Sequence, residues 1–272
     1  MIYPSLLPQV YKLLTHLSRG HGAQTLARLD SKIFPGNRSV NLSSGVAMKL
    51  ASDPHLFGYL LQNHENHIKT WIADNAPSAS SFVDVGANIG YFTGIAISYL
   101  PPGSSVYSIE PDIENFQACA WLEKAATNRN INLHRLNCAV GEQSGELFLN
   151  RHPKFCTYHT VYDTPKDKNK DLKVDCISLH ELADSIKTGE IDCLKVDVEG
   201  YEEFIMRGST NLFKQRRIRT AMIEVTPGSC ATVVFEMAEL AGYRKTIWHS
   251  ERWQEWLHSN QLNHRTDVCL VR

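Results

Sequence analysis

The feature that most constrains the fold is a strand, a glycine turn and a helix that follow one another from Phe82. The letters SFVDV are typical of a short buried strand, and GANIGYFTGIAISYL indicates a glycine turn that opens an apolar helix. Further strands are expected at SVYSIE, INLHRLNCAV, IDCLKVDV and RTAMIEV, with helices between them. Strands that alternate with helices build a parallel sheet through right-handed crossovers. The sequence therefore predicts an α/β, Rossmann-like domain.

Two segments depart from this alternation. ELFLN and KVDCIS, joined by a polar run, predict a hairpin inserted near residues 144–176. Near the end of the chain, RKTIWHS and RTDVCLVR predict a terminal antiparallel pair. The expected sheet is thus mostly parallel, with an antiparallel terminal strand.

Residues 1–75 predict an N-terminal accessory segment ahead of the α/β domain, which is expected over 76–272. Apolar residues recur at helical spacing over 3–17, 24–34 and 56–73. The range 38–50 is hairpin-like, with Gly45 as the expected turn.

The overall composition disfavours several classes of protein. The formal net charge is -1, so no charge bias indicates a nucleic-acid partner. The seven cysteines form no C-x-x-C pair and the histidines no H-E-x-x-H motif, so no metal site is predicted, and the thiols are expected to be buried and reduced. No stretch approaches the ~20 apolar residues of a membrane span, and the N-terminus lacks a signal-peptide pattern. We therefore expect a cytoplasmic protein.

The first candidate site follows the first strand, since ligands of open α/β sheets bind beyond the carboxyl ends of the strands. The motif there is Asp84-x-Gly86-x-Asn88-x-Gly90. Its glycines allow a tight turn and a close approach to a ligand. The acidic residue precedes the glycines, which disfavours a dinucleotide pyrophosphate and fits the ammonium of a methionine-type ligand. The alternative is a structural strand-to-helix turn.

The next two strand ends carry polar residues suited to a nucleoside. Glu110 follows the second strand, about twenty residues beyond the glycine turn, where a carboxylate accepts hydrogen bonds from ribose hydroxyls. Asn137 ends the third strand and is placed to contact an adenine edge, although Asn is equally common as a turn residue.

The fourth strand ends in the charged motif LKVDVEGYE. Alternation places Lys195, Asp197 and Glu199 on one side of an extended chain, which is costly unless they serve one another or a ligand. One carboxylate is expected to accept the proton of an acceptor hydroxyl. The alternatives are a structural lysine–carboxylate network, or a divalent metal held by Asp197 and Glu199, which is possible but not predicted. Glu224, at the end of the fifth strand, either lines the same pocket or caps a neighbour.

These segments together resemble the FkbM-type methyltransferases. The resemblance rests on VDVGANIGYFT, SIEPDIENF, AVGEQSGELFL, DCLKVDVEGYEEFIMRGS and MIEV, and spans roughly residues 56–225. It implies a class I methyltransferase fold, S-adenosylmethionine as the methyl donor, and O-methylation of hydroxyls on sugars, glycans or secondary metabolites. The expected partner is accordingly a small-molecule or glycan acceptor.

The resemblance also assigns roles by position. Asp197 and Glu199 take the acidic strand end, and Glu65 matches an acidic position upstream of the glycine turn. Those matching the cofactor site are Asp84, Gly86, Asn88, Gly90, Glu110, Asn137 and Ala139. Residues 1–50 and the segment from Trp248 lie outside the resemblance, so acceptor specificity is expected there.

Some alternatives stay open at this point. An N-directed methyltransferase fits the same residues, because the sequence does not fix the acceptor atom. A nicotinamide-dependent oxidoreductase would prefer a G-x-G-x-x-G spacing, which is absent. The tryptophans Trp248, Trp253 and Trp256 either wall a sugar pocket or belong to the core.

Overall fold

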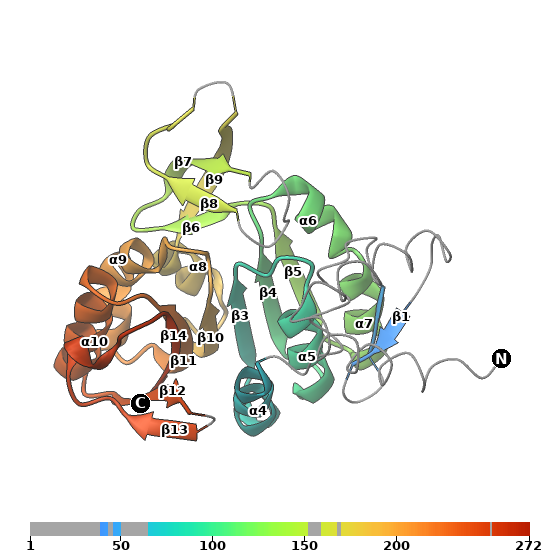
Figure 1. Cartoon of the computed structure of the whole chain (residues 1–272). Coiled ribbons are helices and arrows are strands. Elements are labelled where there is room, and N and C mark those ends of the chain that lie inside the picture. The colour runs from blue at the N-terminus through green and yellow to red at the C-terminus, as the bar shows by residue number, and fades with distance from the viewer. Residues whose placement is uncertain (1–38, 43–45, 50–64, 152–158, 168–169, 251) are drawn as a thin grey trace, which may run out of the picture. The chain divides into compact units, whose positions relative to one another are not determined.

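The computed structural model describes residues 39–42, 46–49, 65–151, 159–167, 170–250 and 252–272 (Figure 1). The chain divides into two compact units, Met1–Asn66 and His67–Arg272, and each is considered by itself. In the first unit β1 (Ser39–Asn41) and β2 (Ala47–Lys49) pair antiparallel, within the range expected to form a hairpin. The helices predicted over 3–17 and 24–34, the Gly45 turn and much of the 56–73 helix lie outside the described residues.

The second unit is built on an eight-stranded sheet with the order β13-β12-β14-β11-β10-β3-β4-β5. Five strands are parallel: β3 (Ser81–Val85), β4 (Ser105–Ile109), β5 (Asn132–Leu136), β10 (Ile191–Val196) and β11 (Ile218–Val225). The other three make antiparallel pairs: β12 (Arg244–His249), β13 (Arg252–Glu255) and β14 (Thr266–Val271). The strand order reverses between β3 and β10, as in Rossmann-like sheets. The predicted fold class, a mostly parallel sheet with an antiparallel terminal strand, is confirmed.

The helices of this unit lie between the strands in sequence, as expected for crossover connections. They are α4 (Asn66–Asn75), α5 (Tyr91–Tyr99), α6 (Ile113–Ala118), α7 (Trp121–Arg129), α8 (Leu179–Ser185), α9 (Glu202–Lys214) and α10 (Ser229–Ala241), with short 3-10 turns η2 (Ala76–Ser78) and η3 (Ser259–Gln261). Among the described residues, no helix has both the length and the apolar character needed to cross a bilayer.

Two helices, α6 and α7, follow Glu110 before the next strand. Asp112 caps α6 by accepting hydrogen bonds from the amides of Glu114 and Asn115. The break before α7 lies against the glycine turn, because the Cys119 thiol donates to the Asn88 carbonyl and the Trp121 indole donates to the Ile89 carbonyl. The two helices are therefore separated where they support the turn.

A second, four-stranded sheet has the order β6-β9-β7-β8. Its strands are β6 (Ala139–Gly141), β7 (Gly145–Asn150), β8 (Thr160–Tyr162) and β9 (Leu172–Ser178), and it lies above the ends of β3 and β4 in Figure 1. β7 and β9 pair antiparallel within the range predicted as an inserted hairpin, but they form a sheet of their own rather than an edge of the large one.

The segment INLHRLNCAV was predicted to be one strand, and this prediction is wrong. The segment forms two strands that lie in different sheets. β5 ends at Leu136 and β6 begins at Ala139. The Asn137 amide between them donates to the backbone carbonyls of Glu110 and Pro111, at 2.9 and 3.0 Å. These bonds turn the chain away from the parallel sheet and direct it into the second sheet.

The centre of the large sheet is buried on both faces. All five residues of β3 are buried, and the last four of β10 are as well. Burial on both faces is typical of parallel sheets, whose faces are covered by the crossover helices. The six described cysteines form no disulfide, and all but Cys138 are buried, as expected of reduced thiols.

Candidate functional site

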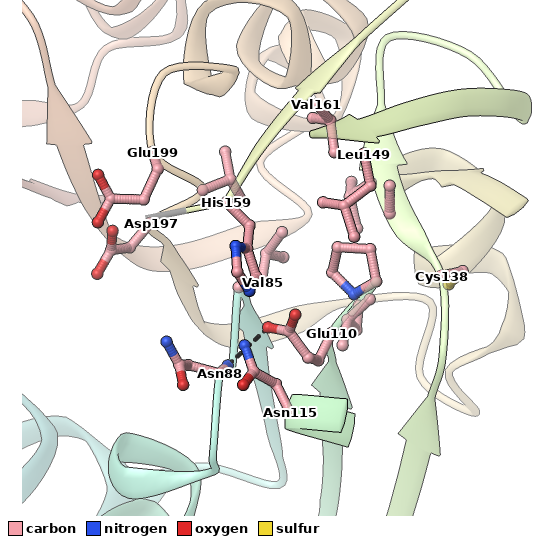
Figure 2. Close-up of a pocket in the computed structure, with 16 residues that line it drawn as sticks. Val85, Asn88, Glu110, Asn115, Cys138, Leu149, His159, Val161, Asp197 and Glu199 are labelled. Atoms are coloured by element: carbon pink, nitrogen blue, oxygen red, sulfur yellow. Dashed lines mark hydrogen bonds between the residues drawn. The ribbon is translucent and has the colours of Figure 1, made fainter. Parts of the chain in front are cut away.

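An open cavity of about 520 Å³ lies at the carboxyl ends of β3, β4 and β10, with the second sheet as one wall (Figure 2). In Figure 2, Asp197 and Glu199 lie toward one end of it and Glu110 toward the other, with His159 between them. The residues lining it are Val85, Gly86, Asn88, Ile109, Glu110, Pro111, Asn115, Cys138, Ala139, Val140, Leu149, His159, Val161, Asp197, Val198 and Glu199. The cavity thus brings together strand ends that are far apart in sequence.

The glycine turn lines the cavity next to the end of β3. The amides of Gly86 and Ala87 both donate to the Ile109 carbonyl at 3.0 Å, which joins the turn to the end of β4. Gly86 has a φ of 79°, and a Cβ there would overlap the backbone carbonyl of Asp197. Gly90, with a φ of 85°, precedes α5 and does not line the cavity. Of the two glycines, Gly86 is therefore the one in contact with the charged strand end.

Asp84 points into the protein rather than into the cavity. Its carboxylate accepts a 2.6 Å hydrogen bond from the Thr93 hydroxyl and lies 3.7 Å from the Lys195 ammonium. Burial raises the pKa of Asp84, and Lys195 opposes that shift. Asp84 is not among the lining residues. Contact between Asp84 and a ligand ammonium therefore stays a prediction, because here a lysine ammonium lies beside the carboxylate.

Glu110 faces the cavity and is held from two sides. Its Oε2 accepts from the Asn88 amide at 2.8 Å, drawn as a dashed line in Figure 2, and its Oε1 accepts from the Asp112 amide at 2.9 Å. The side chain is 6 % exposed, and burial raises its pKa to about 7. The Asn115 side chain also hydrogen-bonds to this carboxylate, so its oxygens are held in place while a carboxylate keeps acceptor capacity for a ligand hydroxyl.

The other predicted cofactor residues lie in different places. Ala139 lines the cavity beside Cys138 and Val140. Asn137 does not line it, because its amide is engaged by the carbonyls of Glu110 and Pro111, so the turn interpretation is the one its contacts favour. Glu65 has a left-handed backbone (φ 59°), immediately precedes α4, and is absent from the lining residues.

Lys195 and Asp197 meet at the end of β10. The Lys195 ammonium is 2 % exposed and lies 3.0 Å from Asp197 Oδ2. The predicted alternation does not continue to Glu199, because β10 ends at Val196 and Glu199 has a φ of 59°. Glu199 instead forms an ion pair with Arg265. Its position depends on the loop after the strand, not on an extended backbone.

Three functional candidates were not predicted from the sequence. The buried Glu202 carboxylate accepts from the amides of Val198 and Gly200, both at 3.0 Å, and so shapes the loop that carries Glu199. Arg265 contacts Glu199 and Glu224, and His159 lies 3.7 Å from Asp112 Oδ2. Glu202 had a signal in the sequence, as an acidic residue in the first turn of a helix. The other two had none.

Asp197, Glu202 and Glu224 offer oxygen atoms within 4.8 Å of one another, which is compatible in distance with a bound cation. Each already has a partner in Lys195, the backbone amides or Arg265. Burial, and after it Asp197, raise the pKa of Glu224 to about 9. These contacts favour the lysine–carboxylate network over a metal site.

The three tryptophans do not line the cavity. Trp256 is 1 % exposed and packs edge-on against Phe235, with ring centroids 5.2 Å apart. Trp248 and Trp253 face each other across β12 and β13, and Trp248 stacks on His67 at 4.6 Å. Their contacts favour the core alternative.

The sequence and the structure of this chain were compared with those of known proteins, and several relatives are similar to it. A methyltransferase from Beauveria bassiana (strain ARSEF 2860), named Methyltransferase 1, is 28% identical over 156 residues, which cover 48% of this chain and 59% of the relative. The aligned part thus spans little more than half the length of that relative.

Two solved structures are also similar. A methyltransferase FkbM from Methylobacillus flagellatus KT has 18% identity and a TM-score of 0.45, covering 70% of this chain and 43% of that one. An O-methyltransferase from Bacillus cereus in complex with SAH has 10% identity and a TM-score of 0.42, covering 91% and 97%.

The family model for the methyltransferase FkbM domain matches residues 84–255. The match begins at the glycine turn and includes Glu110, Asp197 and Glu224. The expected range was 56–225, and the match both starts later and ends later. Glu65 therefore lies outside the match, Trp248 and Trp253 lie inside it, and Arg265 lies beyond its end. Since this range is well over half of the chain, the predicted family is confirmed: the protein belongs to the methyltransferase FkbM domain family.

Proposed function

We propose that this protein transfers the methyl group of S-adenosylmethionine to a hydroxyl oxygen of a small-molecule or glycan acceptor. The observation that carries the proposal is that one cavity is lined by Glu110 at one strand end and by Asp197 at another. The first is suited to a nucleoside and the second to the removal of a proton. Membership of the FkbM family supports this combination.

The residues around Glu110 fit a nucleoside-type donor. The Glu110 carboxylate, fixed by the amides of Asn88 and Asp112, would accept hydrogen bonds from two ribose hydroxyls. Ala139 and Val140, both buried, offer an apolar surface for the base. When bound, the donor supplies an electrophilic methyl group on a sulfonium.

Asp197 is the residue we assign to the acceptor proton. Its Oδ2 is held by Lys195, and within the described part of the chain no hydrogen bond to its Oδ1 is found. The side chain is 28% exposed and lines the cavity, so part of it is accessible to an acceptor hydroxyl. Proton removal by a positioned carboxylate contributes about 10²–10⁴-fold to such a reaction. Lys195 keeps the carboxylate in one orientation.

The test combines binding with product analysis. Calorimetric titration with S-adenosylmethionine and with its demethylated product should give micromolar dissociation constants that are lost in Glu110→Ala. Hydroxylated acceptors are then screened with methyl-labelled donor, and the labelled atom is located by NMR.

Three results would change the proposal. A folded protein that binds neither ligand would remove it altogether. Label on nitrogen would make the enzyme N-directed. Activity lost on exhaustive chelation and restored by a divalent cation would move the acid–base role of Asp197 to a metal.

A further inference from the structure

The carboxylates at the ends of β10 and β11 share one guanidinium. Arg265 Nη1 lies 2.6 Å from Glu199 Oε2 and 3.2 Å from Glu224 Oε2. Glu199 and Glu224 belong to segments that follow or end two neighbouring parallel strands. One side chain from a third segment thus joins both.

Sheet register explains why Arg265 reaches this place. β14 runs antiparallel to β11 and pairs its first residue, Thr266, with Val225 at the end of β11. The residue before Thr266 is therefore brought to the carboxyl edge of the parallel strands, where the cavity lies. Arg265 also lies beyond residues 84–255, the range that matches the FkbM family model. It is a contribution of the C-terminal segment to the site.

The charges around Arg265 explain why a cation is needed between Glu199 and Glu224. The groups gathered here are Asp84, Lys195, Asp197, Glu199, Glu202, Glu224 and Arg265. Lys195 lies on the side of Asp84 and Asp197, and Arg265 lies on the side of Glu199 and Glu224. Like charges this close disfavour one another in a partly buried place. Each cation thus offsets its own part of the acidic group.

We propose that Arg265 is a positioning residue for the acceptor side, one that holds Glu199 and Glu224 in place so that Asp197 is the carboxylate that meets the acceptor. The inference rests on the proposed methyl transfer. Glu199 lines the cavity with Asp197, and its backbone is already fixed by the hydrogen bonds that Glu202 accepts. Arg265 holds the Glu199 side chain, which those backbone hydrogen bonds do not fix.

The variants are Arg265→Gln, Arg265→Lys and, as a matched control, Arg252→Gln, which removes an exposed arginine from β13, two strands away from β14 in the sheet. In Arg265→Gln, kcat should fall at least tenfold, while the dissociation constant for the demethylated donor stays within twofold. Arg265→Lys should give an intermediate kcat, because it keeps the positive charge but loses the planar, pre-organised guanidinium. Arg252→Gln should match the wild type in both quantities.

A second measurement does not depend on turnover. Glutamate labelled with ¹³C at the side-chain carboxyl allows Glu199 and Glu224 to be titrated by NMR, with Glu199→Gln and Glu224→Gln providing the assignments. Removing Arg265 should move both titrations to higher pH, because the cation lowers both pKa values. The control should leave them unchanged.

The outcomes separate the two proposals. A wild-type protein without methyl transfer contradicts the proposed function, and also removes the acceptor role of Arg265. An active wild type whose kcat is unchanged in Arg265→Gln overturns the Arg265 inference alone, as do titrations that do not move. If Arg265→Gln fails to fold, Arg265→Lys decides: kcat equal to the wild type contradicts the inference, and a lower kcat at equal ligand affinity supports it.

Discussion

Gly86 and Asp197 lie backbone against backbone: a Cβ on Gly86 would overlap the carbonyl oxygen of Asp197 and lie 2.9 Å from its carbonyl carbon. The glycine turn after β3 and the charged end of β10 are therefore in direct backbone contact, and there is no room for a side chain at Gly86. The Asp197 amide also donates to the Val85 carbonyl at 3.1 Å. A side chain added at Gly86 would therefore displace both the expected donor side and the expected acceptor side, whereas Asp197 takes part in this contact through its backbone.

Gly86→Ala should accordingly abolish donor binding and destabilise the fold. The overlap with a backbone atom cannot be relieved by a rotamer change, and overpacking of this kind costs about 1–3 kcal/mol. The positive φ of 79° adds roughly 1 kcal/mol for any L side chain. Urea unfolding and calorimetric titration with the demethylated donor measure the two effects.

Gly103→Ala is the matched control, since Gly103 has a φ of 88° and a Cβ added there would have no neighbour within 4 Å. It carries the backbone penalty without the overlap, and it should bind the donor like the wild type. Equal losses of stability in the two variants would contradict the close contact between Gly86 and Asp197.

Glu110 should make donor binding dependent on pH. Its pKa is raised to about 7 by burial, and ribose hydroxyls donate best to the ionised carboxylate. The ionised fraction rises from about one tenth to about nine tenths between pH 6 and pH 8, so the affinity for the demethylated donor should rise about tenfold. Titrations at both pH values measure it. Glu110→Gln should bind more weakly with no such change, and a wild-type affinity equal at the two pH values would contradict the assignment.

The sequence could predict that Gly86, Asn88 and Glu110 lie at one edge of the sheet because the determinants of that placement are local. Gly86, Asn88 and Glu110 follow two neighbouring strands directly, and the ends of parallel strands meet at one edge. Asp84 shows the limit of such patterns. Both faces of a buried parallel strand are covered, so alternation cannot tell which side chain faces the ligand and which faces the interior.

The acceptor side was less predictable because its contacts are distant in sequence. Arg265 and Glu199 are 66 residues apart, and their contact depends on the register of β14 against β11. No periodic pattern encodes that register. The departure of β6 into a second sheet likewise depends on two hydrogen bonds from Asn137, a residue that is equally at home in many turns.

Asp197→Asn should lower turnover by about 10²-fold or more, since it removes the group expected to take the acceptor proton. Donor affinity should stay within twofold, because Glu110 and its partners are untouched. Single-turnover kinetics with labelled donor separates the chemical step from binding. Asp184→Asn, which changes an exposed carboxylate paired with Arg217, is the control and should leave turnover unchanged. Turnover that survives in Asp197→Asn would assign the proton to another group.

Glu224 should make the folded protein less stable as pH rises. Burial, followed by Asp197, raises its pKa from an ordinary 4.5 to about 9. Between these values the folded protein holds a proton that the unfolded chain has released, so the free energy of unfolding falls with pH across this window. Glu224→Gln removes that dependence. Relative to wild type, the variant should gain at least about 1 kcal/mol between pH 6 and pH 9, the equivalent of roughly one pKa unit.

Urea unfolding at the two pH values measures this difference, and groups that titrate equally in both proteins cancel. Glu236→Gln, at an exposed position on α10, is the control and should show no change between the two pH values. A difference between wild type and Glu224→Gln that stays constant with pH would mean that Glu224 titrates alike in the folded and unfolded states. In that case Arg265 would offset both effects that raise the pKa of Glu224, its burial and its proximity to Asp197. The guanidinium would then be the strongest influence on that carboxylate.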